Sequence, residues 1–133
     1  GLGLTVAATL VSGMLGNAMN VLYRDPGYAS LGFSTAMFAM VGLLCADIVV
    51  RTPVRGFRRL VLPVAASMAF LAMLGSEGQN TDYAAHIFGL LSGFLVGPAV
   101  SFAVRHDGIS RSLECLLGCA APLFLLLCWK LAL

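Results

Sequence analysis

Two polar side chains in an otherwise apolar chain are of types that can carry out hydrolysis. Ser34 stands where a polar stretch gives way to an apolar run, and His86 stands near the start of a later apolar run. A serine hydroxyl becomes a nucleophile when a base within hydrogen-bond reach takes its proton, and histidine is the usual base. We therefore predict a two-residue dyad without an orienting carboxylate. Each residue also has a structural interpretation, because serine caps helices and histidine bonds neighbouring helices in membranes.

The composition is that of a membrane protein. Of the 133 residues, 59% are hydrophobic and 11% are charged, whereas a soluble domain carries about 25% charged residues. Most of the apolar runs approach the ~20 residues that a helix needs to cross a bilayer, and in lipid they must be helical to pair their backbone groups. We predict an all-α, polytopic membrane protein with five transmembrane helices in one domain over residues 1–133. The helices are expected at about residues 2–22, 33–50, 60–74, 83–104 and 113–133.

Charges in the connecting segments predict the orientation. Four arginines and no acid lie between residues 51 and 59, while Glu77 and Asp82 lie in the next connection without a base. Short basic loops stay in the cytoplasm, which places both Ser34 and His86 at the non-cytoplasmic side. Because the second run is short, Ser34 is expected below the membrane surface, in a recess open to water. Asp82 is expected close to water.

Small and aromatic residues favour close packing between the apolar run that begins near Ser34 and the one that contains His86. Gly89, Gly93 and Gly97 share a face with His86, within about 80° of helical arc, and small residues four apart let membrane helices pack closely. Phe38 lies one turn after Ser34. Its ring is suited to pack under the imidazole, and the alternative is an ordinary aromatic residue facing lipid.

The start of the second run also suits an oxyanion site. The first N–H groups of a helix are unpaired and lie at the positive end of its dipole, so the Ser34 N–H and its neighbours can stabilise a tetrahedral oxyanion. Gly32 permits the tight turn and the close backbone approach that such a site needs.

These motifs resemble those of the rhomboid intramembrane serine proteases. Gly32-x-Ser34 at a helix start is similar to the family's Gly-x-Ser-Gly, and Ala85-His86 followed by Gly89 and Gly93 is similar to Ala-His-x-x-Gly-x-x-x-Gly. The resemblance covers about residues 10–97 and implies that Ser34 is the nucleophile, His86 the base and Phe38 the aromatic residue packed against it. It implies hydrolysis of a peptide bond in or next to a transmembrane segment of a substrate protein, without a metal or cofactor.

The chain departs from the family pattern in two ways. Thr35 replaces the glycine after the serine, which adds bulk beside the oxyanion site. The family's first two helices are missing, and with them a His-x-x-x-Asn pair that helps to bind the oxyanion. The chain begins with Gly1 in apolar sequence and without a signal peptide, so we expect a fragment whose parent is active and which is itself impaired, because losing one oxyanion donor costs about 10²–10³ in turnover.

Two other functions stay open at the sequence level. One is a rhomboid-like scaffold that binds client helices without cutting them. The other is a piece of a transporter, which predicts ionisable residues along a midplane pathway. His86 lies near one end of its run and forms no such pathway.

The expected environment follows from the same observations. The partners are a transmembrane substrate protein and the lipid bilayer, and no nucleic acid is expected. The expected location is the bacterial inner membrane, with the active site facing away from the cytoplasm, and the oligomeric state is not predicted. The four cysteines all lie in apolar runs and are interpreted as small helix residues, not as a disulfide or metal site.

Overall fold

The computed structural model describes residues 1–24, 33–51, 57–74, 82–106 and 108–132. The described residues form five helices and no strand, which confirms the predicted fold class. Four of these helices are long and apolar enough to cross a membrane, and α3 is a shorter apolar helix. The helices are α1 (Leu2–Tyr23), α2 (Ser34–Arg51), α3 (Arg58–Leu74), α4 (Tyr83–His106) and α5 (Arg111–Ala132).

The observed helix ends lie close to the sequence predictions. Four residues used in the sequence predictions, Gly32, Arg55, Glu77 and Leu133, lie outside the described residues.

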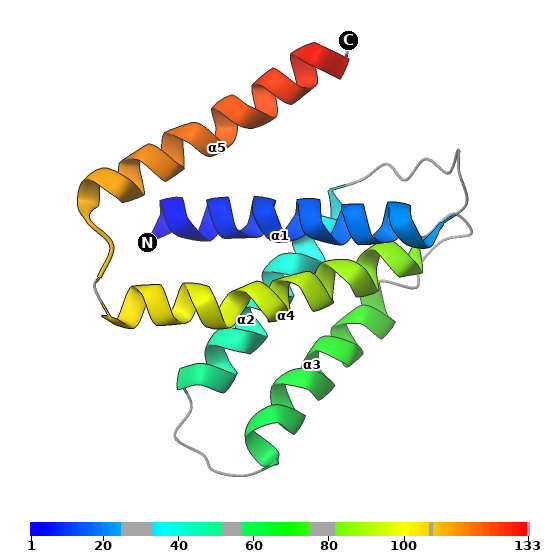
Figure 1. Cartoon of the computed structure of the whole chain (residues 1–133). Helices are drawn as coiled ribbons and strands as arrows, with labels where there is room; N and C mark the ends of the chain where they lie inside the picture. Colours follow the sequence, from blue (N-terminus) through cyan, green and yellow to red (C-terminus); the bar gives the residue numbers. More distant parts are fainter. Residues whose placement is uncertain (25–32, 52–56, 75–81, 107, 133) are drawn as a thin grey trace.

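Helix α4 lies at the centre of the contacts, and its interface with α2 is the most extensive in the molecule. The two helices run in the same direction, since Gly89 lies against Thr35 and, further along both helices, Gly97 lies against Ala46. Helix α1 runs the opposite way along α4 (Figure 1). Consequently the start of α2, the start of α4 and the end of α1 meet at one end of the bundle.

Close approach of α1, α2 and α4 depends on residues without a side chain. A Cβ atom on Gly16 would lie 2.8 Å from the Cα atom of Gly89. A Cβ atom on Gly93 would collide with the carbonyl oxygen of Ala39, and one on Gly42 would collide with that of Leu90. The predicted glycine stripe of α4 is therefore the surface on which α1 and α2 pack.

Two buried hydroxyl groups add polar contacts to this packing. Ser92 Oγ on α4 donates a hydrogen bond of 2.6 Å to the backbone oxygen of Ser12 on α1. Ser101 Oγ, further along α4, donates one of 2.7 Å to Asp47 Oδ1 on α2. Arg51, four residues after Asp47 on α2, donates to the same carboxylate oxygen over 2.7 Å.

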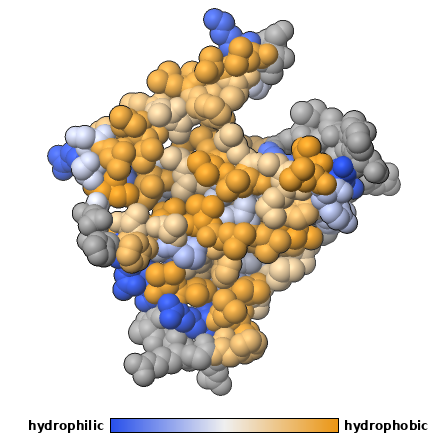
Figure 2. All heavy atoms as spheres, in the orientation of Figure 1, coloured by the Kyte–Doolittle hydropathy of each residue, from blue (hydrophilic) through white to orange (hydrophobic). Residues whose placement is uncertain are grey.

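The distribution of side chains is the reverse of that in a soluble protein. The buried residues are mainly small ones such as alanine, glycine, serine and threonine, whereas large apolar side chains are exposed on every helix. Figure 2 shows apolar residues over most of the visible face, with the most hydrophilic ones near its edges. Such a surface is suited to lipid, and the chain is an integral membrane protein.

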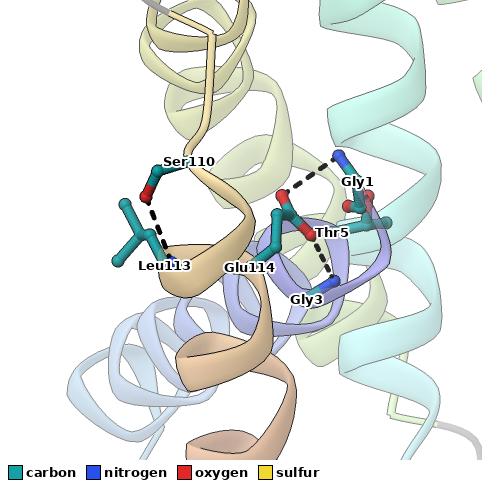
Figure 3. Close-up of polar contacts among 6 residues, drawn as sticks. All are labelled: Gly1, Gly3, Thr5, Ser110, Leu113 and Glu114. Atoms are coloured by element: carbon teal, nitrogen blue, oxygen red, sulfur yellow. Dashed lines mark hydrogen bonds and ion pairs between the residues drawn. The ribbon is translucent and has the colours of Figure 1, made fainter.

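Helix α5 contacts α1 and no other helix of the described residues. The backbone N–H of Gly3 donates a hydrogen bond of 2.9 Å to Glu114 Oε2, and Glu114 Oε1 lies 3.1 Å from the Gly1 nitrogen (Figure 3). Ser110 Oγ caps α5 by accepting a hydrogen bond of 3.2 Å from Leu113 N. Beyond this point α5 diverges from α1 toward its C-terminal end (Figure 1).

Candidate active site

Ser34 is the first residue of α2, and its side chain is exposed. The carbonyl oxygen of Phe33 accepts the first backbone hydrogen bond of this helix, from Met37 N over 3.1 Å. The N–H groups of Ser34 and the two residues after it therefore have no partner within the helix. This position gives the Ser34 hydroxyl a neighbouring set of backbone donors, as an oxyanion site requires.

His86 lies on the first turns of α4 and is 6% exposed. The ring of Phe38, one turn after Ser34, lies against the imidazole with 4.4 Å between ring centroids and 30° between ring planes. Phe38 also meets Phe70 of α3 edge to face, at 5.7 Å between centroids. The imidazole is thus held beside the first turns of α2, on the helix face to which Ser34 belongs.

The structure brings His86 to Phe38 but does not join it to Ser34 by a hydrogen bond. No hydrogen bond links the two side chains among the described residues, and the buried Nδ1 atom of His86 has no hydrogen-bond partner there. Hydrogen bonds between catalytic groups are often long in a protein without substrate and tighten when the reacting complex forms.

Gly89 and Gly93 set the distance between the two helices below His86. A Cβ atom on Gly89 would collide with the carbonyl oxygen of Thr35, just as one on Gly93 would collide with that of Ala39. Thr35 is 2% exposed, and its methyl group would be 3.0 Å from a Cβ on Gly16. The added bulk of Thr35 therefore fills the junction of α1, α2 and α4.

Sequence reasoning missed a cluster of polar side chains beside His86. Asp82 Oδ1 accepts hydrogen bonds from Ala85 N (3.1 Å) and from an Arg24 Nη (2.9 Å). Asp82 Oδ2 accepts one of 2.7 Å from Asn20 Nδ2. The Asp82 side chain is only 10% exposed, so its carboxylate is mostly enclosed by these partners. The signal was present in the sequence as an acid three residues before Ala85, at a helix-capping position.

The described cysteines and acids offer no metal centre. The part of the chain that the structure describes holds no group of three or more histidine, cysteine, aspartate or glutamate side chains placed to bind a metal ion. The cysteines are free thiols, with Cys45 buried and Cys115, Cys119 and Cys128 exposed.

The fold is an all-helical bundle with lipid-facing apolar surfaces, which is the architecture of a polytopic membrane protein. A serine and a histidine near one end of the α2–α4 interface form a candidate hydrolytic site. The sequence model of a family described as Rhomboid domain matches residues 1–102. The chain therefore belongs to the rhomboid family, whose members are generally serine proteases and include inactive ones. Comparisons with curated proteins and with solved structures found no match. Helix α5 lies beyond the matched residues.

Proposed function

We propose that the chain is the core of an intramembrane serine endopeptidase that cuts a peptide bond in or next to a transmembrane segment of another protein. In this proposal Ser34 is the nucleophile and His86 is the general base. The support is the membership of the rhomboid family together with the placement of His86 against the first turns of α2.

The observation that carries the proposal is the contact between Phe38 and His86. Ser34 precedes Phe38 by one helical turn, so the two side chains point to neighbouring parts of the same face of α2. The imidazole of His86 packs against that face, with 4.4 Å between its ring centroid and that of Phe38.

The reaction follows from the chemistry of these groups. The Ser34 hydroxyl attacks the scissile carbonyl carbon while His86 takes its proton, and the oxyanion accepts hydrogen bonds from the free N–H groups at the start of α2. His86 then gives its proton to the leaving amine, which leaves an acyl-enzyme. Water attacks the ester with His86 again as base, releasing the second product and restoring the serine. The substrate helix must unwind locally, because its carbonyl groups are otherwise hydrogen-bonded.

The proposal includes the membrane in which the protein acts and the side that its active site faces. The loop arginines favour an orientation in which the shared end of α2 and α4 faces away from the cytoplasm. The bacterial inner membrane is the proposed site of action.

A covalent probe tests the assignment. Membranes containing the full-length protein are treated with a fluorophosphonate, which is expected to label the wild type and to fail with Ser34→Ala and His86→Ala. Matched controls are Ser101→Ala, a buried serine at the other end of α4, and His106→Ala, the second histidine of the chain. Both controls are expected to keep the label. Labelling that persists in Ser34→Ala would end the assignment.

A non-proteolytic scaffold that binds client helices is the second candidate. The observation that favours it is the exposed Ser34 side chain, which makes no hydrogen bond to His86 within the described residues. A scaffold is expected to retain a client helix in co-purification, while wild type and Ser34→Ala are equally unlabelled and leave that helix uncut.

A further inference from the structure

The carboxylate of Asp82 joins two helices at the point where α4 begins. On its own helix it caps the first turn, since Oδ1 accepts a hydrogen bond of 3.1 Å from Ala85 N. A carboxylate at this position also interacts favourably with the positive end of the helix dipole. The Asp82 backbone oxygen accepts a hydrogen bond of 3.3 Å from His86 N, so the residue holds the turn that carries the imidazole through both its side chain and its backbone.

The last turns of α1 hold the same carboxylate from the other side. Asn20 Nδ2 donates to Oδ2 over 2.7 Å, and an Arg24 Nη donates to Oδ1 over 2.9 Å. Asn20 is 1% exposed, so its hydrogen bond lies away from water. Hydrogen bonds to an ionised acceptor are roughly twice as strong as neutral ones, which makes this bridge a firm attachment of α4 to α1.

A second attachment lies one turn beyond His86. Gly16 of α1 packs against Gly89 of α4, where a Cβ atom on Gly16 would be only 2.8 Å from the Gly89 Cα atom. His86 therefore lies between two contacts of α4 with α1, one polar at Asp82 and one tight at Gly89. Together they fix the rotation and height of the turn whose imidazole lies on Phe38.

We propose that Asp82, bridged to Asn20 and Arg24, is the positioning residue of His86. This inference rests on the proposed function for its catalytic consequence. The carboxylate does not act on the imidazole directly: it caps the turn that precedes His86 and ties that turn to α1. With the bridge broken, the first turn of α4 is no longer tied to α1, and the imidazole leaves its fixed place beside α2.

A series of Asp82 variants separates the cap from the bridge. Asp82→Ser keeps a hydroxyl that caps α4 but is too short to reach both α1 side chains. Asp82→Asn keeps the cap and an acceptor for Arg24, but it removes the charge and places an NH2 donor opposite the Asn20 Nδ2 donor. The full-length protein is labelled with isotopic histidine, and the His86 imidazole signal is assigned by its loss in His86→Gln. We expect Asp82→Ser to move or split this signal and Asp82→Asn, which keeps part of the bridge, to move it less.

Cleavage kinetics on the same variants give the functional arm. Asp82→Ser is expected to lower kcat by about 10- to 100-fold with KM unchanged, because a misplacement of about 1 Å costs up to about 10²-fold in rate. Asp82→Asn is expected to lower kcat less than Asp82→Ser does. The matched control is Ser101→Ala, which removes the hydrogen bond to Asp47 at the far end of α4 and should leave both the signal and kcat unchanged.

The imidazole signal and the cleavage kinetics test the positioning role and the proposed function independently. The positioning role is overturned if Asp82→Ser leaves the His86 signal and kcat at their wild-type values, or if Ser101→Ala changes them equally. The imidazole signal can be measured without catalysis. If the signal moves in Asp82→Ser but cleavage does not depend on Ser34, the positioning role is retained and the proposed function is rejected.

Discussion

The phenyl ring of Phe38 and the imidazole of His86 lie against each other across the α2–α4 interface, with their centroids 4.4 Å apart. Few side chains of this size are buried, since the closely packed helices are joined mainly by glycine, alanine, serine and threonine. In this pair a large buried side chain of one helix packs directly against a titratable side chain of the other.

Replacing Phe38 with leucine should slow catalysis without weakening substrate binding. The substitution keeps an apolar side chain but removes the flat surface against which the imidazole lies. Aromatic pairs contribute about 0.5–1.5 kcal/mol beyond their buried area, so kcat is expected to fall by up to about tenfold. The measurement is steady-state cleavage by the full-length protein. Phe70→Leu is the control, because it removes the other aromatic neighbour of Phe38 and leaves the His86 contact in place; an equal loss in the control would contradict the argument.

A methyl group on the glycine stripe of α4 should destabilise the bundle. In Gly93→Ala the new Cβ atom collides with the backbone oxygen of Ala39, which cannot move without shifting α2. We expect the free energy of unfolding to fall by about 1–3 kcal/mol, as for other overpacked interiors. Gly118→Ala on α5 is the matched control, since its Cβ atom would lie at an ordinary 3.7 Å from Gly3 Cα. Unfolding in mixed micelles measures both variants, and equal stabilities would contradict the prediction.

Hydropathy and small-residue spacing were sufficient to predict the fold because lipid leaves few alternatives. An apolar run of this length has to be helical, and a repeat of Gly89, Gly93 and Gly97 has to face another helix. Both expectations depend only on local pattern, and the observed helices and the packing of the stripe agree with them.

Local pattern could indicate the helix cap at Asp82 but not the partners of its carboxylate on α1. The members of this polar cluster come from the end of α1 and the start of α4, which are far apart in the sequence, so local pattern does not pair them. The loop-charge argument treated Asp82 as an exposed acid without a base, whereas tertiary packing supplies Arg24 from another connection. The pairing of Ser34 with His86 is likewise a prediction, since sequence gives each residue its helix but not the rotamer of its side chain.

Removal of α5 should leave the rest of the bundle folded. Among the described residues α5 contacts only α1, to which it is joined by the hydrogen bond of Glu114 with Gly3 and by apolar residues as far as Phe124. It also lies outside the part matched by the family. Deleting residues 108–133 from the full-length protein is therefore expected to keep the thermal unfolding midpoint and fluorophosphonate labelling close to those of the wild type. A loss of labelling with an unchanged midpoint would show that α5 acts on the site, contrary to this expectation.

Restoring the family's glycine at position 35 should cost stability in this chain. The Thr35 methyl group fills the junction where α1 meets α2 and α4, near Gly16 and Gly89, and the residue is 2% exposed. Thr35→Gly leaves that space empty and adds a flexible residue to the first turn of α2, so the free energy of unfolding is expected to fall by about 1–3 kcal/mol. Thr35→Ser, which removes only the methyl group, should show an intermediate loss in the same micelle titration. If Thr35→Gly instead matches the wild type in stability, the methyl group does not fill the junction. The methyl group would then lie beside the oxyanion site, as the sequence predicted.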